Sequence, residues 1–214
     1  MPMICGVDEA GKGSVLGPMV IAAVACPRLD DLSSLGVADS KKLSKSRREE
    51  LNTIIRADFP HSVVIRSAEE IDTLRLSMTM NEIVARAHAE AIDQLSCTTA
   101  YLDACDANEK RYAETIRGLI KKPVEIIAAH KADSLFPPVS AASIVAKVER
   151  DRLIEDLSLE YGLIGSGYPS DPVTITYLKE YIASNNKPPV IARSSWETVK
   201  HLLHAKDQRS LLDF

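Results

Sequence analysis

Two adjacent carboxylates, Asp8 and Glu9, end an apolar run that predicts a strand, and the turn Gly11-Lys12-Gly13 follows them. Side chains alternate between the two faces of a strand, so neighbouring acids cannot both lie on one solvated face. A buried carboxylate is costly unless a partner or a metal ion compensates its charge. Its oxygens suit hard cations such as Mg²⁺ or Mn²⁺. The pattern indicates metal-dependent phosphodiester chemistry, and the alternative is a strand end with two solvated acids.

The glycines of the turn add a second element of chemistry. Glycine has no Cβ, so backbone N–H groups in Gly11-Lys12-Gly13 can approach an anion or a sugar closely. We therefore expect a binding turn directly beside the two acids in the sequence.

Two more acids end apolar runs in the manner of Asp8. Asp103 closes the run that begins at Tyr101, and Asp133 follows the apolar run 124–129. Ligands of such sheets gather beyond the strand ends, where residues from separate strands meet. We expect one site for two divalent cations, about 3.5–4 Å apart, made by four carboxylates: Asp8, Glu9, Asp103 and Asp133. For Asp103 or Asp133 taken singly, the alternative is a cap of a turn or of the next helix.

Hydrophobic spacing predicts the elements that must position these acids. Strands are expected at 3–8, 18–26, 61–66, 99–104 and 124–129. Helices are expected at 44–57, 68–75, 79–95, 108–120, 140–161, 171–184 and 194–204. Antiparallel strands first and strand–helix–strand units later indicate an α/β fold, a mixed sheet flanked by helices. Pro188-Pro189 predicts a boundary between a domain of residues 1–187 and a C-terminal helical extension of residues 188–214.

Composition restricts the class of protein. The 214 residues are 45% hydrophobic and 26% charged, which is typical of a globular protein. No apolar stretch approaches the roughly 20 residues that span a bilayer, and the N-terminus lacks the pattern of a signal peptide. Four cysteines without Cys-x-x-Cys spacing indicate reduced thiols, so we expect a cytoplasmic protein without membrane contact. The net charge of −4 argues mildly against nucleic-acid binding, but bound cations would neutralise an acidic site.

The order of the motifs resembles one family. Six segments occur in the order seen in ribonuclease HII, and the chain is similar to the archaeal branch of that family over nearly its whole length. They are Gly6–Gly13, Asp39–Leu43, Tyr101–Asp103, His130–Asp133, Val139–Lys147 and Gly165–Pro172.

The resemblance implies a ribonuclease H-like core and an endoribonuclease with a role in DNA replication and repair. Its substrates would be the RNA strand of RNA–DNA hybrids and ribonucleotides embedded in duplex DNA, cut to leave a 5′-phosphate and a 3′-hydroxyl. The family's catalytic, Mg²⁺- or Mn²⁺-binding carboxylates correspond to Asp8, Glu9, Asp103 and Asp133.

The resemblance also assigns substrate contacts. Gly11, Lys12 and Gly13 would sense the ribose 2′-hydroxyl, the group that separates RNA from DNA, chiefly through the backbone. Tyr168 would stack on the sugar of the following nucleotide. Lys41 and Lys147 would contact phosphates, and their alternative is a solvated or helix-capping role.

One residue departs from the family pattern. Lys12 stands where the family usually has arginine between the two glycines. Lysine lacks the bidentate guanidinium, so a phosphate contact from this side chain should be looser. Sensing through the backbone does not depend on the side chain. We expect altered affinity or junction preference and retained activity.

The last seven residues fit the pattern Gln-x-x-aliphatic-x-x-aromatic through Gln208, Leu211 and Phe214. This pattern resembles a peptide that docks on sliding clamps of the PCNA type, with apolar anchors in a pocket. The usual pair of aromatic residues is reduced to Phe214. The alternative is the end of an amphipathic helix or a frayed tail.

The sequence thus predicts a monomeric endoribonuclease that uses two divalent cations. Two alternatives remain: a non-catalytic hybrid-binding or clamp-associated module, and a related ribonuclease H-like nuclease that acts on DNA. The presence of all four carboxylates disfavours the non-catalytic module, because a degenerate enzyme would be expected to have lost one.

Overall fold

The computed structural model describes residues 2–37 and 43–212, with only the backbone for residues 206–212. The chain divides into two compact units, each treated by itself. The first contains Met1–Ala10, Val20–Ile65 and Thr79–Glu149, and the second contains Gly11–Met19, Arg66–Met78 and Arg150–Phe214. Within the described ranges we find no helix that is long and apolar enough to cross a membrane. The boundary expected at residue 188 stays a prediction.

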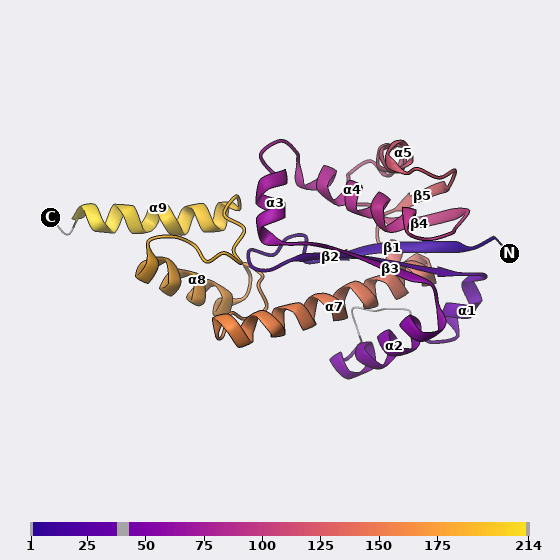
Figure 1. The fold of residues 1–214 in the computed structure, drawn as a ribbon, viewed down its shortest axis with the longest axis horizontal. Coiled ribbons are helices and arrows are strands. Elements are labelled where there is room, and N and C mark those ends of the chain that lie inside the picture. The colour runs from indigo at the N-terminus through magenta and orange to yellow at the C-terminus, as the bar shows by residue number, and fades with distance from the viewer. Residues whose placement is uncertain (1, 38–42, 213–214) are drawn as a thin grey trace. The chain divides into compact units, whose positions relative to one another are not determined.

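The first unit is built on a five-stranded mixed sheet (Figure 1). Its spatial order is β3 (His61–Arg66), β2 (Met19–Cys26), β1 (Ile4–Ala10), β4 (Thr99–Asp103) and β5 (Glu125–Ala129). Strand β1 is antiparallel to β2 and parallel to β4, and β5 extends the parallel half. The predicted mixed sheet flanked by helices is confirmed. Strand β1 continues to Ala10, beyond the predicted end at residue 8, so Asp8 and Glu9 both lie within the strand.

Helices cover the sheet of the first unit. They are α1 (Leu29–Ser33), α2 (Lys45–Asp58), α4 (Met80–Asp93), α5 (Glu109–Leu119), α6 (Ala132–Leu135) and the beginning of α7 (Pro137–Tyr161). Figure 1 shows α4 and α5 on one side of the sheet and the beginning of α7 on the other. Helices α1 and α6 were not predicted, because five and four residues are too few to show a helical period.

Local sequence explains where the longer helices begin. Thr79 caps α4 by accepting from the backbone N–H of Glu82, and the Glu82 carboxylate accepts in return from the backbone N–H of Thr79. This capping box satisfies N–H groups that the first turn leaves without partners. Asn108 caps α5 in the same manner, by accepting from the backbone N–H of Arg111. The two caps fix the starts of the helices that cover one face of β1 and β4.

The start of α7 lies directly on β1 at Gly6. A Cβ atom at Gly6 would overlap the backbone of Pro138 and Val139. Gly6 and Asp8 share one face of the strand, and Val139 and Ser143 share one face of the helix. From Gly6 to Asp8 the strand rises about 6.7 Å, and from Val139 to Ser143 the helix rises about 6 Å. The two distances nearly match, so a helix that contacts the strand at Gly6 also contacts it at Asp8. The close approach at Gly6 therefore brings Ser143 to Asp8, with which it forms a hydrogen bond.

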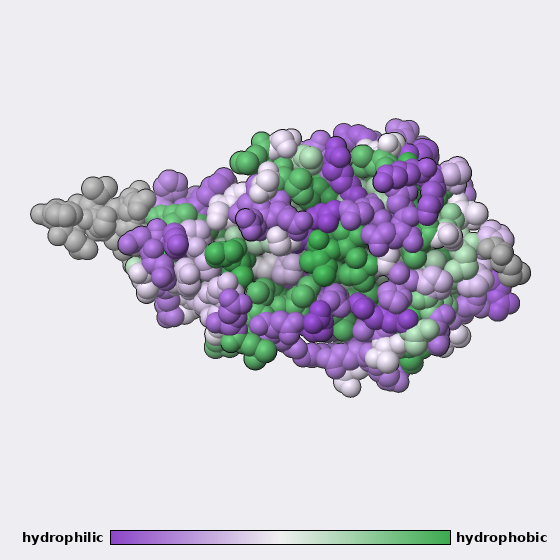
Figure 2. Space-filling model, in the orientation of Figure 1, coloured by the Kyte–Doolittle hydropathy of each residue, from purple (hydrophilic) through white to green (hydrophobic). Residues whose placement is uncertain are grey.

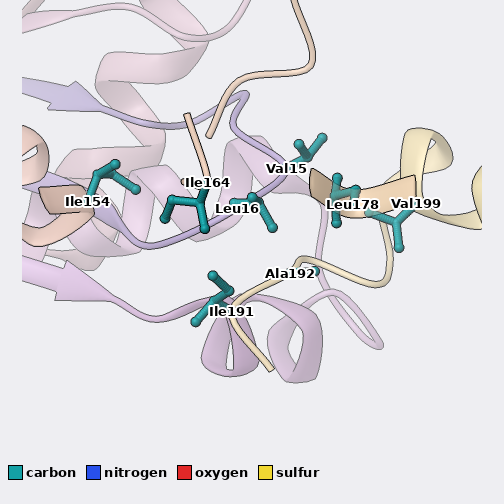
Figure 3. Packing of buried hydrophobic residues seen from close by; sticks show 8 residues of the cluster. All are labelled: Val15, Leu16, Ile154, Ile164, Leu178, Ile191, Ala192 and Val199. Carbon is teal, nitrogen blue, oxygen red and sulfur yellow. The ribbon is translucent and has the colours of Figure 1, made fainter. Parts of the chain in front are cut away.

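The second unit has its own hydrophobic cluster, shown in Figure 3. Its side chains come from the segment 11–19, from the later part of α7, from α8 (Pro172–Asn185) and α9 (Glu197–Leu212), and from the chain between these helices. Its members are Val15, Leu16, Ile154, Ile164, Leu178, Ile191, Ala192 and Val199. The unit also contains α3 (Ala68–Leu74), whose Asp72 carboxylate accepts from the backbone N–H groups of Ser194 and Ser195. The predicted helical C-terminal region is thus present, and α9 runs past the predicted end at residue 204.

Exposed hydrophobic residues occur on both units. Ile65 of β3 is 41% exposed, and Figure 2 shows hydrophobic residues at the surface over the middle of the sheet. Hydrophilic residues surround them over the helices. Scattered hydrophobic residues are ordinary on a protein surface and indicate no function by themselves.

The contact at Gly6 leads to a stability prediction with a matched control. Gly6→Ala should destabilise the protein by about 3 kcal/mol, because the methyl group must displace helix backbone. Gly118→Ala should stabilise it by roughly 0.5–1 kcal/mol, because exposed Gly118 lies in α5 with nothing within 4 Å of its added Cβ. Urea unfolding of both variants measures the difference. Equal effects of the two substitutions would contradict the close approach.

Candidate active site

Asp8 and Asp103 lie side by side on neighbouring parallel strands. The register pairs Val7 of β1 with Leu102 of β4, so the two aspartates come next on each strand. Neighbouring strands are about 4.8 Å apart. The parallel register therefore places two carboxylates at one point of the sheet, as the strand-end argument predicted.

Asp133 lies on α6, not at the end of a strand. Lys131 precedes it with φ 55°, a left-handed conformation that turns the chain so that α6 begins immediately. The Ala132 N–H, beside Asp133, donates to the Asp103 carboxylate over 3.2 Å. Phe136 at the end of α6 stacks on Tyr101 of β4, with ring centroids 4.3 Å apart. These contacts hold α6, and the buried Asp133 with it, against β4.

Glu9 points to the other face of β1, because it follows Asp8 directly in the strand. Its Oε2 lies 3.1 Å from Nε2 of His88 on α4. The His88 side chain is fully buried, and its Nδ1 lies 3.0 Å from the hydroxyl of Tyr112 on α5. The two acids of the opening motif are therefore supported by different helices.

Asp8 is 6% exposed, and its surroundings disfavour the ionised form. Burial raises the pKa of Asp8 well above the ordinary value, and the charges of Glu9 and Asp103 raise it further. Hydrogen bonds from Ser143 and from the Glu9 N–H, the latter over 2.8 Å, act in the opposite direction. The net result is a carboxyl group that is costly to ionise unless a positive charge compensates it.

The donor set suits divalent cations. Asp8, Glu9, Asp103 and Asp133 offer only carboxylate oxygens, the donors that Mg²⁺ and Mn²⁺ prefer. In the part of the chain that the structure describes, no three acidic, histidine or cysteine side chains form a closed metal site. The charges of Glu9 and Asp103 raise the pKa of Asp8, and a bound cation would offset that repulsion. The donor chemistry of the four side chains therefore fits divalent cations.

The neighbouring acid Asp106 has a structural role. Its carboxylate accepts from the Asn108 N–H and from Arg111. Both interactions lower the pKa of Asp106, the backbone bond most. Asp106 is thus a fully paired acid on a loop before α5, which makes it a useful comparison for the buried carboxylates.

In the second unit, Arg193 organises the turn Gly11-Lys12-Gly13. Its guanidinium is fully buried and donates to the backbone carbonyls of Gly11, Lys12 and Gly17. Burial lowers the pKa of Arg193, and the charge of Arg150 lowers it further. A single side chain thus fixes three carbonyl groups of one short segment.

Tyr168 is attached to the same turn. Its hydroxyl accepts from the Gly11 N–H over 3.1 Å, and the Arg150 guanidinium lies over its ring at 4.5 Å. Gly11 adopts φ 84°, and a Cβ there would overlap Arg150 and Pro18. Gly13 is different, since nothing lies within 4 Å of an added Cβ. Gly11 is therefore required by the fold, whereas Gly13 leaves open space.

The remaining predicted residues are placed only in part. Lys12 is half-buried in the turn, and Lys147 is half-buried on α7 in the first unit. Lys41 and Phe214 lie outside the described residues. Gln208 and Leu211 belong to the backbone of α9, and their side chains lie outside the description.

Sequence reasoning missed the residues that support the site. The three main ones are His88, Arg150 and Arg193, each of which is at most 1% exposed. Arg150 lies between Glu149 and Asp151, so its position in the sequence gave no signal of burial. For His88 and Arg193 the available signal was position, because each lies beside apolar residues of a buried stretch. That signal shows burial but cannot show which group the side chain contacts.

Comparison with known proteins gives consistent matches over the whole chain. The family model of ribonuclease HII matches residues 5–199. The ribonuclease HII of Methanospirillum hungatei is 70% identical over 212 residues, which cover 99% of this chain and 100% of that protein.

Two solved structures share the fold and much of the sequence. Ribonuclease H2 from Pyrococcus horikoshii aligns with a TM-score of 0.90 at 38% identity, covering 96% of this chain and 99% of that one. Ribonuclease HII from Archaeoglobus fulgidus, solved as a complex with PCNA, aligns with a TM-score of 0.87 at 46% identity. That alignment covers 91% of this chain and 95% of the other.

The raised pKa of Asp8 predicts a pH-dependent gain in stability from Asp8→Asn. A pKa raised by folding means that stability is highest below the ordinary carboxyl pKa and falls as pH rises toward the folded value. Asparagine removes this loss and still accepts from the Glu9 N–H. In EDTA the variant should be more stable by roughly 0.5–2 kcal/mol near neutral pH, with a smaller gain near pH 4.

Asp106→Asn is the matched control for this measurement. The lowered pKa of Asp106 means that its charge stabilises the fold above the ordinary carboxyl pKa, so the variant should lose stability near neutral pH. Urea unfolding at both pH values checks the signs. A loss of stability in Asp8→Asn near neutral pH would contradict the electrostatics of the site.

Proposed function

Because this chain belongs to the ribonuclease HII family, we propose that its four carboxylates hold the cations used by a metal-dependent endoribonuclease. The chain is such a hydrolase, and its reaction is cleavage of the RNA strand of RNA–DNA hybrids. The observation that carries the assignment of residues is the parallel register that sets Asp8 beside Asp103. Asp8 is buried and Asp103 is half-buried, and their charges repel each other at one point of the sheet. Such an arrangement is costly to the fold and favours the binding of cations.

We propose Mg²⁺ or Mn²⁺ as the two cations. Both prefer oxygen ligands, and the four side chains supply no nitrogen or sulfur donor. When bound, the cations stabilise the attacking and leaving oxygens and lower the pKa of the attacking water. Asp8 and Asp103 would hold the cations on one face of the sheet. Asp133 would complete the set from α6, and the longer side chain of Glu9 would join it from the other face of β1. In-line attack would leave a 5′-phosphate and a 3′-hydroxyl.

We propose that the turn Gly11-Lys12-Gly13 contacts the ribose 2′-hydroxyl of the substrate. The open space at Gly13 supports a close approach of the ligand to the backbone. The Arg193 bonds hold the carbonyls of Gly11 and Lys12 in fixed directions, so the turn is preorganised. Tyr168, held by the Gly11 N–H and by Arg150, would present its ring to the sugar of the following nucleotide. Lys12 would make a looser phosphate contact than arginine.

We propose that the substrates include single ribonucleotides embedded in duplex DNA as well as longer RNA–DNA hybrids. A turn that senses the 2′-hydroxyl needs only one ribose. Lys41 and Lys147 are proposed phosphate contacts. All four cysteines are free thiols, which supports action in a reducing compartment such as the cytoplasm.

We also propose that the C-terminal tail binds a PCNA-type sliding clamp through Gln208, Leu211 and Phe214. The pattern of these residues supports this, and the relative from Archaeoglobus fulgidus was solved as a complex with PCNA. Clamp binding would bring the enzyme to replicating DNA.

Cleavage of duplex DNA that carries one ribonucleotide tests the assignment of the site. Asp8→Asn and Asp103→Asn should each lower kcat by a factor of about 100–1,000 with Mg²⁺ or Mn²⁺, a loss typical of removing a group that stabilises transition-state charge. Asp106→Asn, which alters a nearby acid of structural role, should cleave like the wild type.

Three outcomes would contradict the proposal. Equal activity of Asp8→Asn and the wild type would remove the carboxylate from the mechanism. Equal cutting of an all-DNA duplex would favour the DNA-directed nuclease, and no cutting by the wild type would favour the non-catalytic module.

Truncation after Lys206 tests the tail. The shortened chain should bind the clamp at least about tenfold more weakly, because buried aromatic and aliphatic anchors carry most of the energy of such contacts. Its cleavage of a free duplex should be unchanged. Isothermal titration with the clamp measures the affinity, and equal affinity of the two chains would show that the tail is not the binding segment.

A further inference from the structure

A buried chain of polar contacts ends on the Glu9 carboxylate. The His88 Nε2 lies 3.1 Å from Glu9 Oε2, and the His88 Nδ1 lies 3.0 Å from the Tyr112 hydroxyl. His88 has no exposed surface, and Tyr112 is 2% exposed. The two rings meet edge to face at 6.0 Å and 80°. Both nitrogens of one imidazole are therefore engaged within the core.

The direction of the hydrogen bonds follows from the carboxylate. An ionised carboxylate only accepts hydrogen bonds, so the Nε2 of His88 must carry the proton that faces Glu9. In the tautomer that carries only this proton, Nδ1 accepts from the Tyr112 hydroxyl. The Cys105 thiol, which hydrogen-bonds the same hydroxyl, completes the chain. Tyr112 thus selects the tautomer of His88 that can donate to Glu9.

The arrangement also restricts the motion of Glu9. A glutamate has several rotatable bonds, and fixing it on binding a ligand costs conformational entropy. His88 comes from α4 and Tyr112 from α5, whose starts are fixed by caps. Two helices therefore determine where the Glu9 oxygens lie before any cation arrives. Groups that hydrogen-bond a metal-binding side chain commonly affect metal affinity 10- to 100-fold.

We propose that His88, oriented by Tyr112, is a positioning residue that holds the Glu9 carboxylate ready for cation binding. The inference rests on the proposed function, in which Glu9 is one of the cation ligands. The alternative is a purely structural role, in which His88 only fills space between α4, α5 and β1. The two roles predict different effects of replacing His88 by a ring of similar volume that has no hydrogen-bond donor. Cation affinity would fall if His88 positions Glu9 and would stay unchanged if His88 only fills space.

Direct measurement of Mn²⁺ binding distinguishes them. Free Mn²⁺ is quantified by its electron paramagnetic resonance signal during titration of the full chain, without nucleic acid. His88→Phe keeps an aromatic ring and removes the donor, and His88→Gln keeps an N–H donor near the position of Nε2. Tyr112→Phe removes only the hydroxyl. Thermal unfolding in EDTA confirms that each variant is folded.

We expect His88→Phe to raise the Kd for Mn²⁺ about tenfold or more. His88→Gln should restore it to within about threefold of the wild type, since the donor is retained. Tyr112→Phe should lie between these, because the tautomer is no longer selected. The Mn²⁺ concentration for half-maximal cleavage should follow the same order, and kcat at saturating Mn²⁺ should change much less.

Tyr177→Phe is the matched control. The Tyr177 hydroxyl is buried without a hydrogen-bond partner among the described residues and lies in the second unit. Its removal should leave the Mn²⁺ affinity unchanged, so a change seen in Tyr112→Phe reflects the contact with His88.

Glu9→Gln separates failure of this inference from failure of the proposed function. Weakened Mn²⁺ binding in Glu9→Gln, with wild-type affinity in both His88→Phe and Tyr112→Phe, would overturn the positioning role alone. Wild-type affinity and cleavage in Glu9→Gln would instead remove Glu9 from the metal site, and both proposals with it. If His88→Phe does not fold, the Mn²⁺ affinities of His88→Gln and Tyr112→Phe decide. Wild-type affinity in Tyr112→Phe overturns the positioning role. Weakened affinity in Tyr112→Phe together with near wild-type affinity in His88→Gln supports it.

Discussion

The close approach of α7 to β1 at Gly6 is the contact on which the first unit depends. Any side chain at Gly6 would meet the backbone of Pro138 and Val139, so the helix can follow the strand only because this residue lacks one. The same alignment covers Asp8 and supplies the hydroxyl of Ser143 to it. Burial under the helix is also the largest cause of the raised pKa of Asp8. The absence of a side chain at Gly6 thus allows the close packing of the helix on the strand and, with it, the burial of the Asp8 carboxyl.

The two neighbouring acids depend on different parts of the fold because they lie on opposite faces of one strand. Asp8 belongs to the face covered by α7, with Asp103 beside it and Asp133 close to Asp103 along α6. Glu9 belongs to the face covered by α4, where an imidazole holds it. Each acid therefore has a hydrogen-bond donor suited to its face, a hydroxyl for the shorter side chain and a ring nitrogen for the longer one. The charges of Glu9 and Asp103 still reach Asp8 and contribute to its raised pKa.

Contacts within the second unit hold the turn Gly11-Lys12-Gly13 in one conformation. Glycine loses more conformational freedom on folding than other residues, so the turn needs strong contacts to stay in one form. Arg193 supplies them through backbone carbonyls, while Arg150 supports the ring of Tyr168. Two buried guanidinium groups in one unit are electrostatically unfavourable, as the lowered pKa of each shows. A nearby polyanion such as a nucleic-acid strand would reduce that cost.

The sequence by itself determined the sheet, most of its helices and the family, because hydrophobic period and ordered motifs are local properties. It also singled out the four acids proposed for the site. It could not determine that β1 runs past Asp8 or that Asp133 lies on a helix, since a left-handed Lys131 and a four-residue α6 leave no periodic signal. It also did not reveal His88, Arg150 or Arg193 as supports of the site. His88 and Arg193 lie beside apolar residues in the sequence, whereas Arg150 lies in a charged run. The partners are far away along the chain, 79 residues for His88 and Glu9 and 182 for Arg193 and Gly11. Only the tertiary structure brings such pairs together, because packing of distant segments, not local preference, decides which buried donor meets which acceptor.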